Sequence, residues 1–284
     1  MPEQLRERVY SAKSQLTSPL TMLGSMAADL VASGDLGWRL LVRNVSEQYR
    51  QTLFGYLWLI IPPICTAAVW VFLNSQKILT VGKTDIPYPV YVLVGTLLWQ
   101  LFTRSATQPI MHMFKNQAVI SKLNFPKEAI IIASFGEMLF NAAIQLLILI
   151  PVFLWFRIPV GTTLLLAPAG VLMVVLLGTT IGLLLLPLGS LYKDVMRGVP
   201  LVMRAWFFLT PIVYPEPKEG IASLLADYNP VSPFLLTTRR WLTGTMPESM
   251  TPFYTMLFVT SVALLFGWIL MRVAMPAIIE RMNA

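Results

Sequence analysis

The chain has 284 residues, of which 56% are hydrophobic and only 12% are charged, and its formal net charge is +7. Because a soluble globular domain carries about 25% charged residues, this deficit excludes an ordinary soluble protein and predicts an all-α integral membrane protein. The basic residues collect in the gaps between apolar runs, so the positive charge does not indicate nucleic-acid binding.

Residues 1–52 are predicted to be a cytoplasmic N-terminal segment that contains an amphipathic helix. Charged residues recur there at three- and four-residue spacing, and apolar residues form the other face. The charged face is Arg39, Arg43, Glu47 and Arg50, and the apolar face is Leu36, Leu40, Leu41 and Val45. This pattern is typical of a helix that lies in the membrane interface. An ordinary cytosolic helix is the weaker alternative, because the sequence offers no other domain for it to pack on.

Six apolar segments within 53–274 are predicted to form a transmembrane domain, since a span needs about 20 mostly apolar residues. The predicted spans are 53–73, 88–108, 129–155, 163–190, 198–214 and 252–274. The fifth is shorter than the others and carries Arg204. An even number of spans places both termini on the same side of the membrane, and 275–284 form a terminal tail.

The distribution of Lys and Arg predicts which side this is. If both termini lie inside, the inner segments hold fifteen Lys and Arg residues and the outer segments hold six. Both termini are therefore predicted to be cytoplasmic, as is the stretch between the second and third spans.

That stretch, HMFKNQAVISKLNFPKEA (112–129), interrupts the apolar sequence with polar and basic residues. Its apolar edge is Val119, Ile120 and Leu123, and its positive charges are Lys115, Lys122 and Lys127. Phe125 can anchor in the interface, and Pro126 suits the first position of the helix that follows. The pattern would suit a short amphipathic element that transmits force from a soluble motor, and a merely solvated connector is the alternative.

The longest predicted outer loop, 215–250, contains two apolar pieces, IASLLA and VSPFLL, which are broken by proline and glycine. Neither piece is long enough to span a bilayer. Short re-entrant helices that dip into the outer leaflet at about 215–245 would fit, provided that protein shields their backbone from lipid.

Most catalytic and metal-binding patterns are absent from the sequence. The chain has one histidine, His112, and no Gly-x-x-x-x-Gly-Lys-Ser/Thr sequence. A metal cluster or a catalytic triad is therefore not expected, and the chain has no phosphate-binding loop of its own. We expect a non-enzymatic chain without a bound cofactor. If the protein does energy-driven work, ATP and magnesium bind to a separate ATPase chain.

Polar residues inside the spans are candidate functional residues, because such groups are costly in a bilayer. Glu137, Asn141 and Gln145 fall at four-residue intervals in the third span and so share one helical face. They could line a path or bind a neighbouring helix. Alternatively, Glu137 could reach the lipid headgroups while the two amides hold helix to helix, and the sequence favours neither interpretation. Arg104 could extend to the inner surface or pair with Glu137, and the first is favoured.

Most of the aromatic residues lie near span ends, where an interfacial belt explains them. Some rings could instead face a passage and stack on sugars. The candidates for this role are Trp58, Tyr91, Trp99 and Trp155.

Three stretches resemble motifs of a known transporter family. They are RNVSEQYRQTLFGYLWLIIPP (43–63), FKNQAVISKLNFPKEAI (114–130), and LYKDVMRGVPLVMRAWFFLTPIVYP (191–215) followed by YNPVSPF (228–234). Together they resemble the membrane subunit of the ABC exporters that move O-antigen, capsular polysaccharide or teichoic acid. Lys193 and Thr210 stand where this family usually has Arg and Ser, which leaves the substrate branch open.

The resemblance implies a homodimer in a bacterial inner membrane, with two copies of a separate ATPase subunit and a glycan on a polyprenyl-diphosphate lipid as substrate. It also implies a coupling helix at about 115–124 that docks on the ATPase. The candidate coupling residues are Lys115, Val119, Ile120, Lys122, Leu123 and Phe125. The short outer helices would gate a channel, with Tyr228, Asn229 and Pro230 as candidates.

Two alternatives to polysaccharide export follow from the sequence. One is a permease for a smaller lipid, a drug or teichoic acid. The other is a membrane enzyme that modifies polyprenyl lipids, which is disfavoured because the outer acidic residues are scattered along the sequence without the spacing of a catalytic pair.

Overall fold

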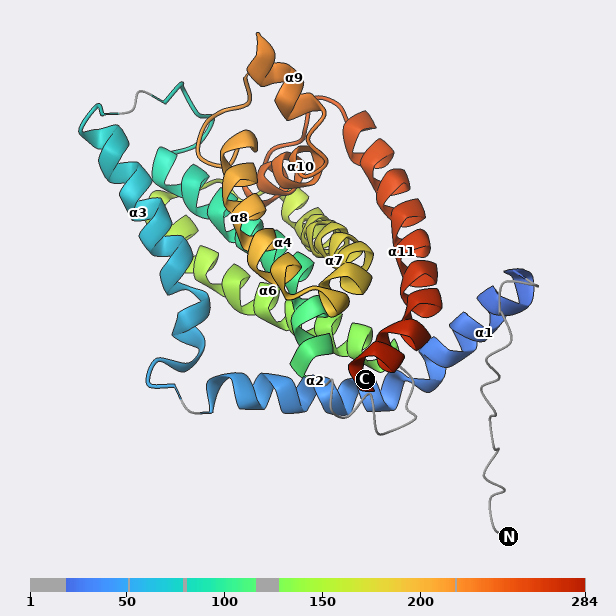
Figure 1. The fold of residues 1–284 in the computed structure, drawn as a ribbon. Helices are drawn as coiled ribbons and strands as arrows, with labels where there is room; N and C mark the ends of the chain where they lie inside the picture. Colours follow the sequence, from blue (N-terminus) through green and yellow to red (C-terminus); the bar gives the residue numbers. More distant parts are fainter. Residues whose placement is uncertain (1–18, 51, 79–80, 116–127, 218, 284) are drawn as a thin grey trace.

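The computed structural model of the chain describes residues 19–50, 52–78, 81–115, 128–217 and 219–283. All regular structure in these ranges is helical, which confirms the predicted all-α class. Figure 1 shows α1 and α2 across one end of the helical bundle and α9 and α10 at the opposite end. We call these the basal end and the distal end.

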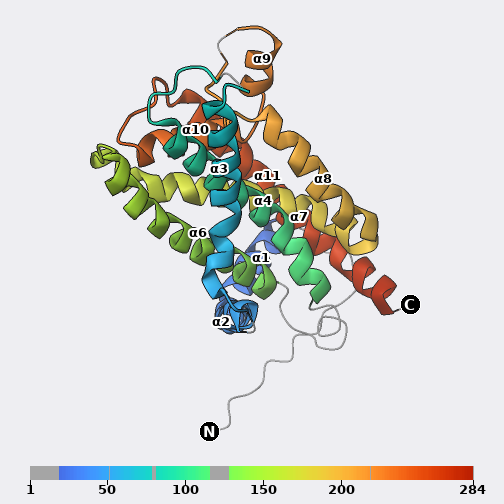
Figure 2. The same ribbon diagram turned by 90° about the vertical axis from the view of Figure 1, so that its left-hand side faces the viewer.

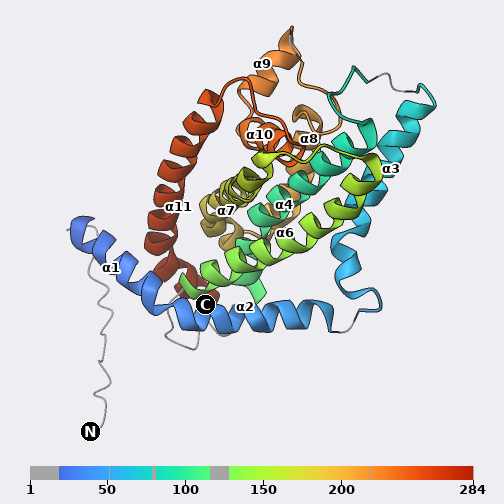
Figure 3. The ribbon, with the colours of Figure 1, turned by 180° about the vertical axis from the view of Figure 1, so that it is seen from behind.

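The basal end is built from α1 (Pro19–Ala32) and α2 (Gly34–Tyr49), which Figure 3 shows running beneath the other helices. Two glycines let α2 lie directly against α6 (Glu128–Phe156). A Cβ atom added at Gly37 would lie 2.7 Å from Cγ2 of Ile132, and one added at Gly136 would lie 2.8 Å from a methyl group of Leu41. The helix that the charge spacing predicts is observed as α2. Its place in the membrane interface stays a prediction.

Six helical segments correspond to the six predicted spans. They are a 3-10 turn (Gly55–Leu59) with α3 (Ile61–Ser75), α4 (Tyr88–Lys115), α6, a 3-10 turn (Thr162–Leu166) with α7 (Ala167–Leu191), α8 (Lys193–Leu209) and α11 (Thr251–Asn283). Within the described ranges, three segments are long and apolar enough to cross a membrane: α6, Thr162–Leu191 and Thr251–Met275. Since α3 is a shorter apolar helix, the full set of six spans stays a prediction.

All six segments differ from the predicted bounds at one end or both, and prolines explain two of the differences. The α-helix of the first segment starts at Ile61, immediately before Pro62 and Pro63, because a proline fits only the first turn of a helix without loss of a hydrogen bond. The helix expected at 198–214 ends at Leu209, and Thr210 is extended with φ −105° and ψ 136°. The residue before a proline avoids the helical region, so Pro211 explains this ending.

The centre of the bundle is α4, which contacts α3, α6, α7, α8 and α10 (Figure 2). Its closest neighbour is α7, where two glycines four residues apart face the α4 backbone. A Cβ at Gly178 would lie 2.6 Å from the Phe102 carbonyl oxygen, and one at Gly182 would lie 2.7 Å from that of Ala106. Small residues at this spacing let two membrane helices approach closely.

The distal end contains the short helices α9 (Ile221–Asp227) and α10 (Ser232–Leu242). Both fall within the segment 215–245 that the sequence predicts to be re-entrant, and neither is long enough to span a bilayer. α10 packs against α4, α7 and α11. How deep these helices lie in the membrane stays a prediction.

Candidate functional site

A buried polar network connects three helices near the basal end. Glu137, Asn141 and Gln145 are all buried on one face of α6. The Glu137 carboxylate accepts a hydrogen bond from Gln108 Nε2 at 2.8 Å, and its other oxygen lies 2.9 Å from His112 Nε2. Gln145 donates to the Leu59 carbonyl at 3.2 Å. The contacts of Glu137 and Gln145 join helical segments, and whether the stripe also lines a path stays a prediction.

The network continues from His112 to α2. His112 Nδ1 lies 3.0 Å from Asn44 Nδ2, and the side-chain oxygen of Asn44 accepts from Arg43 at 3.3 Å. Because the amide nitrogen of Asn44 is a donor, Nδ1 of His112 is the acceptor and Nε2 carries the proton toward Glu137. The last turn of α4 is thereby bonded to α2 on one side and to α6 on the other.

Ion pairs hold the two described residues on either side of the segment 116–127. On one side, Lys115 Nζ lies 3.2 Å from Glu47 Oε2 on α2. On the other side, Glu128 Oε1 lies 3.5 Å from Arg272 on α11, and Arg272 lies 2.8 Å from Asp29 on α1. These pairs connect the end of α4 to α2, and the start of α6 to α11 and α1.

The other candidate coupling residues lie in that segment, outside the described residues: Val119, Ile120, Lys122, Leu123 and Phe125. Their docking on an ATPase stays a prediction. Arg104 is half-buried on α4. Whether Arg104 extends toward the inner surface or pairs with Glu137 stays a prediction.

At the distal end, Asn229 ties the end of α8 to the start of α10. Its side-chain oxygen accepts from Trp206 Nε1 at 3.1 Å and from the Val231 backbone N–H at 3.0 Å. Its side-chain nitrogen donates to Thr210 Oγ1 at 2.8 Å. Tyr228 beside it is 86% exposed, and Pro230 is half-buried. The three gate candidates therefore differ, with Asn229 inside the chain and Tyr228 on its surface.

The same end contains a buried cation that the sequence counted only as an outer charge. The Arg239 side chain is 3% exposed and lies 3.8 Å above the ring of Tyr91. Its guanidinium donates to the carbonyl oxygens of Pro211 at 3.1 Å and Ile212 at 2.8 Å. The cation–π contact and the two carbonyl groups replace its lost hydration.

Gly95 on α4 makes room for this arrangement. A Cβ there would lie 2.5 Å from the Ile212 carbonyl oxygen and would also collide with the Arg239 guanidinium. The Tyr91 hydroxyl donates to the Tyr214 carbonyl at 3.0 Å. The non-helical segment 210–214 is thus held on α4 from both sides. The sequence signal that could have indicated this site is the pair Arg239 and Arg240 at the end of a short amphipathic segment that also carries Phe234, Leu235 and Trp241.

The four candidate sugar-facing aromatics fall into two groups. Tyr91 and Trp99 are buried within the chain, Tyr91 beneath Arg239 and Trp99 among other aromatic rings. Trp58 and Trp155 are exposed, with Trp155 at 84%. Contact with a sugar stays a prediction for all four, and only the second group presents its rings at the surface of this chain.

The described residues contain no group of three or more His, Cys, Asp or Glu side chains that could hold a metal ion. Their polar contacts instead join helices at the two ends of the bundle. These contacts hold the helices to one another.

The class of protein to which this chain belongs is that of the membrane transporters. A family model described as ABC-2 type transporter matches residues 36–240, and the chain belongs to this family. The chain is 26% identical over 214 residues to the O-antigen export system permease protein RfbA of Klebsiella pneumoniae, covering 72% of this chain and 79% of that protein. The family resemblance identified from the motifs is thereby confirmed.

Two further relatives are similar over most of the chain. The O-antigen export system permease protein RfbA of Myxococcus xanthus is 24% identical over 196 residues, which cover 68% of this chain and 74% of that protein. The polysialic acid transport protein KpsM of Escherichia coli is 23% identical over 241 residues, which cover 82% of this chain and 91% of that protein.

Proposed function

We propose that this chain is the membrane permease subunit of an ATP-driven exporter. Its substrate would be a polysaccharide linked to a polyprenyl-diphosphate lipid, which moves from the cytoplasm to the outer side of a bacterial inner membrane. The observation that carries this proposal is the similarity, over 68% to 82% of the chain, to permeases named for O-antigen export and polysialic acid transport.

The transporter would be a homodimer with two copies of a separate ATPase subunit, which bind ATP and magnesium. Six spans with cytoplasmic termini would place the basal end at the ATPase and the distal end at the outer leaflet. The excess of Lys and Arg in the predicted inner segments supports this orientation.

The basal contacts support a coupling role for the segment between α4 and α6. Lys115 and Glu128 are the described residues on either side of it, and each is held by an ion pair to another helix. A coupling element needs firmly held ends, since a loose segment would absorb the motion of the ATPase rather than pass it on. The buried bonds from His112 to Asn44 and Glu137 would carry that motion into α2 and α6.

The distal contacts support a gate that is anchored at one edge. Arg239 and Asn229 fix α10 and the segment 210–214 to α4 and α8. Exposed residues such as Tyr228 are then the part that would move or meet the substrate.

A deletion strain tests the proposed function in the cell. Without the chain, polyprenyl-linked polymer should accumulate on the cytoplasmic side, where added glycosidase reaches it only after the inner membrane is opened. A plasmid copy of the chain should restore polymer at the outer surface. Surface polymer at normal levels in the deletion strain would contradict the proposal and would favour a smaller lipid or a drug as the substrate.

A further inference from the structure

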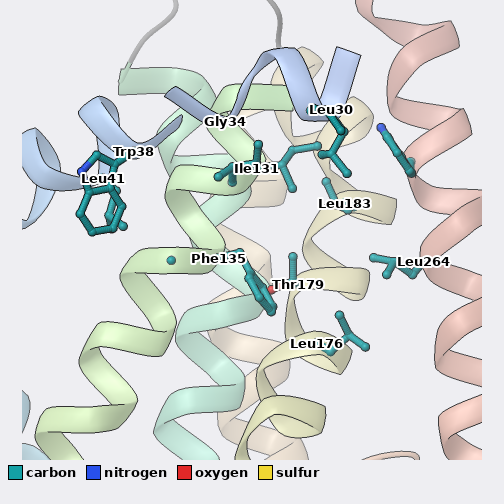
Figure 4. A pocket seen from close by; sticks show the side chains of 14 residues that line it. Leu30, Gly34, Trp38, Leu41, Ile131, Phe135, Leu176, Thr179, Leu183 and Leu264 are labelled. Carbon is teal, nitrogen blue, oxygen red and sulfur yellow. The ribbon is translucent and has the colours of Figure 1, made fainter. Parts of the chain in front are cut away.

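An apolar groove of about 710 Å³ lies between the junction of α1 and α2 and the helices α6, α7 and α11. Figure 4 shows side chains that enter it from four sides, with Leu30 of α1 above, Phe135 on α6, Leu183 on α7 and Leu264 on α11. Thr179 contributes the one hydroxyl among its lining side chains, and this hydroxyl already donates to the Val175 carbonyl at 2.9 Å. The groove therefore offers a ligand mostly apolar contacts, together with the Nε1–H of Trp268, which is buried and makes no hydrogen bond within the described residues.

The groove lies at membrane depth. Three of its walls belong to α6, α7 and α11, the helices that are long and apolar enough to cross a bilayer. Its fourth wall is the α1–α2 junction, where Gly34 and Trp38 line it. A tryptophan that is 64% exposed on an amphipathic helix is typical of the bilayer surface. With α2 at that surface, as the sequence predicts, the groove would run from it into the hydrocarbon region.

The groove's size also suits one lipid chain. Its volume is within the roughly 300–1,000 Å³ that is usual for small-molecule sites. An apolar groove between candidate membrane-spanning helices and an amphipathic helix matches the acyl chain of a lipid.

We propose that this groove binds one acyl chain of a membrane phospholipid, which fills the space between the α1–α2 junction and helices α6, α7 and α11. The bound chain would bury apolar surface on all four sides at once, and this burial favours binding. It would also fix the position of α2, the helix that carries Asn44 and Glu47. The proposal requires only that the chain lies in a bilayer, and it does not depend on the exported substrate.

Gly34 offers a variant that fills the groove without a collision. A Cβ at Gly34 would meet no atom within 4 Å, and the same is true of Gly24 on α1, which does not line the groove. Gly34→Leu therefore places a side chain in the groove, and Gly24→Leu is the matched control. Both replace glycine within a helix, which favours the helix to a similar degree.

The measurement is native mass spectrometry of the chain with its ATPase, extracted in mild detergent from membranes. We expect phospholipid to be retained by the wild type and by Gly24→Leu. Because the added leucine occupies apolar surface that the acyl chain would bury, Gly34→Leu should retain about tenfold less. Equal retention in all three proteins would overturn the proposal, as would a polyprenyl lipid or a second copy of the chain in the phospholipid's place.

A second measurement on the wild type keeps the test decisive if Gly34→Leu fails to fold. Phosphatidylethanolamine with a photoreactive acyl chain is reconstituted with the protein, and the labelled peptides are sequenced. Label on the peptides that contain Phe135 or Leu264 supports the proposal. Label confined to peptides outside the groove would overturn it.

Discussion

The basal and distal ends of the chain both bury charged side chains, but they compensate the charge differently. At the basal end, a largely buried cation meets carboxylates, as Arg272 meets Asp29 and Glu128. At the distal end, Arg239 meets two backbone carbonyls and a ring, and no carboxylate of the described residues lies within 4 Å of it.

This difference bears on which end can move. A contact between two side chains can break and form again as helices shift, whereas carbonyl groups are fixed by the path of the backbone. We therefore expect the basal end to transmit motion from the ATPase and the distal end to act as a rigid frame. Each of the following substitutions disrupts contacts at one end of the chain and leaves the contacts at the other end unchanged.

The largest effect is expected from Leu123→Asp in the predicted coupling segment. A carboxylate on its apolar edge should abolish the stimulation of ATP hydrolysis in the partner subunit, because an apolar contact would have to bury a charge. Insertion into the membrane should be unchanged. Ser121→Asp, which adds the same charge beside that edge, is the control. Undiminished stimulation in Leu123→Asp would remove the coupling assignment.

Arg239→Met should destabilise the distal end. The carbonyls of Pro211 and Ile212 would lose their donor, and each buried group left without a partner costs about 1–3 kcal/mol. Thermal unfolding in detergent measures the loss. The control is Arg240→Met, because Arg240 lies 3.8 Å from Glu216 in a partly exposed pair and such pairs contribute little. If the two variants unfold at the same temperature, Arg239 is not the anchor of this end.

Glu137→Gln should weaken the basal network. The new amide nitrogen would face either Gln108 or His112, both of which donate to the carboxylate. The loss of one hydrogen bond to a charged group costs about 1.5–3 kcal/mol. ATP stimulation should also fall, because α4 and α6 would no longer be joined through this carboxylate.

Glu219→Gln is the control for that change, since Glu219 is exposed in the distal loop. Both variants are compared in unfolding experiments and in ATPase assays. A Glu137→Gln protein that matches the control in both experiments would mean that the network transmits nothing.

The smallest effect is expected from Lys115→Gln. The pair between Lys115 and Glu47 is about half exposed, so its loss should cost less than about 1 kcal/mol. The difference from wild type should shrink in high salt, because salt screens exposed charges. Unfolding at low and high salt measures it. If Lys115→Gln lowered the free energy of unfolding more than Glu137→Gln does, the exposed pair would contribute more than the buried network, which would contradict the prediction.

The sequence predicts the helices better than their ends and predicts single residues better than their partners. Hydropathy alone identifies α6, α7 and α11, because their apolar runs are long. The start of α3 at Ile61 and the end of α8 at Leu209 depend on adjacent prolines, whose effect on the backbone a hydropathy window does not register.

The polar stripe on α6 was predicted from spacing, but its partners were not. Asn44 and His112 are 68 residues apart in the sequence, and only the packing of α2 across the ends of α4 and α6 brings them together. Arg239 was missed for a similar reason, since its partners at Pro211 and Ile212 are backbone atoms, which leave no signal in side-chain chemistry.

Reconstituted transport tests the proposed export most directly. The chain and its ATPase are placed in liposomes with the ATPase outside, and polyprenyl-diphosphate-linked polysaccharide is supplied in the outer leaflet. With ATP, the polymer should become protected from added glycosidase, and Leu123→Asp should prevent this. Protection that is the same with and without ATP, or the same in wild type and Leu123→Asp, would contradict the proposed function.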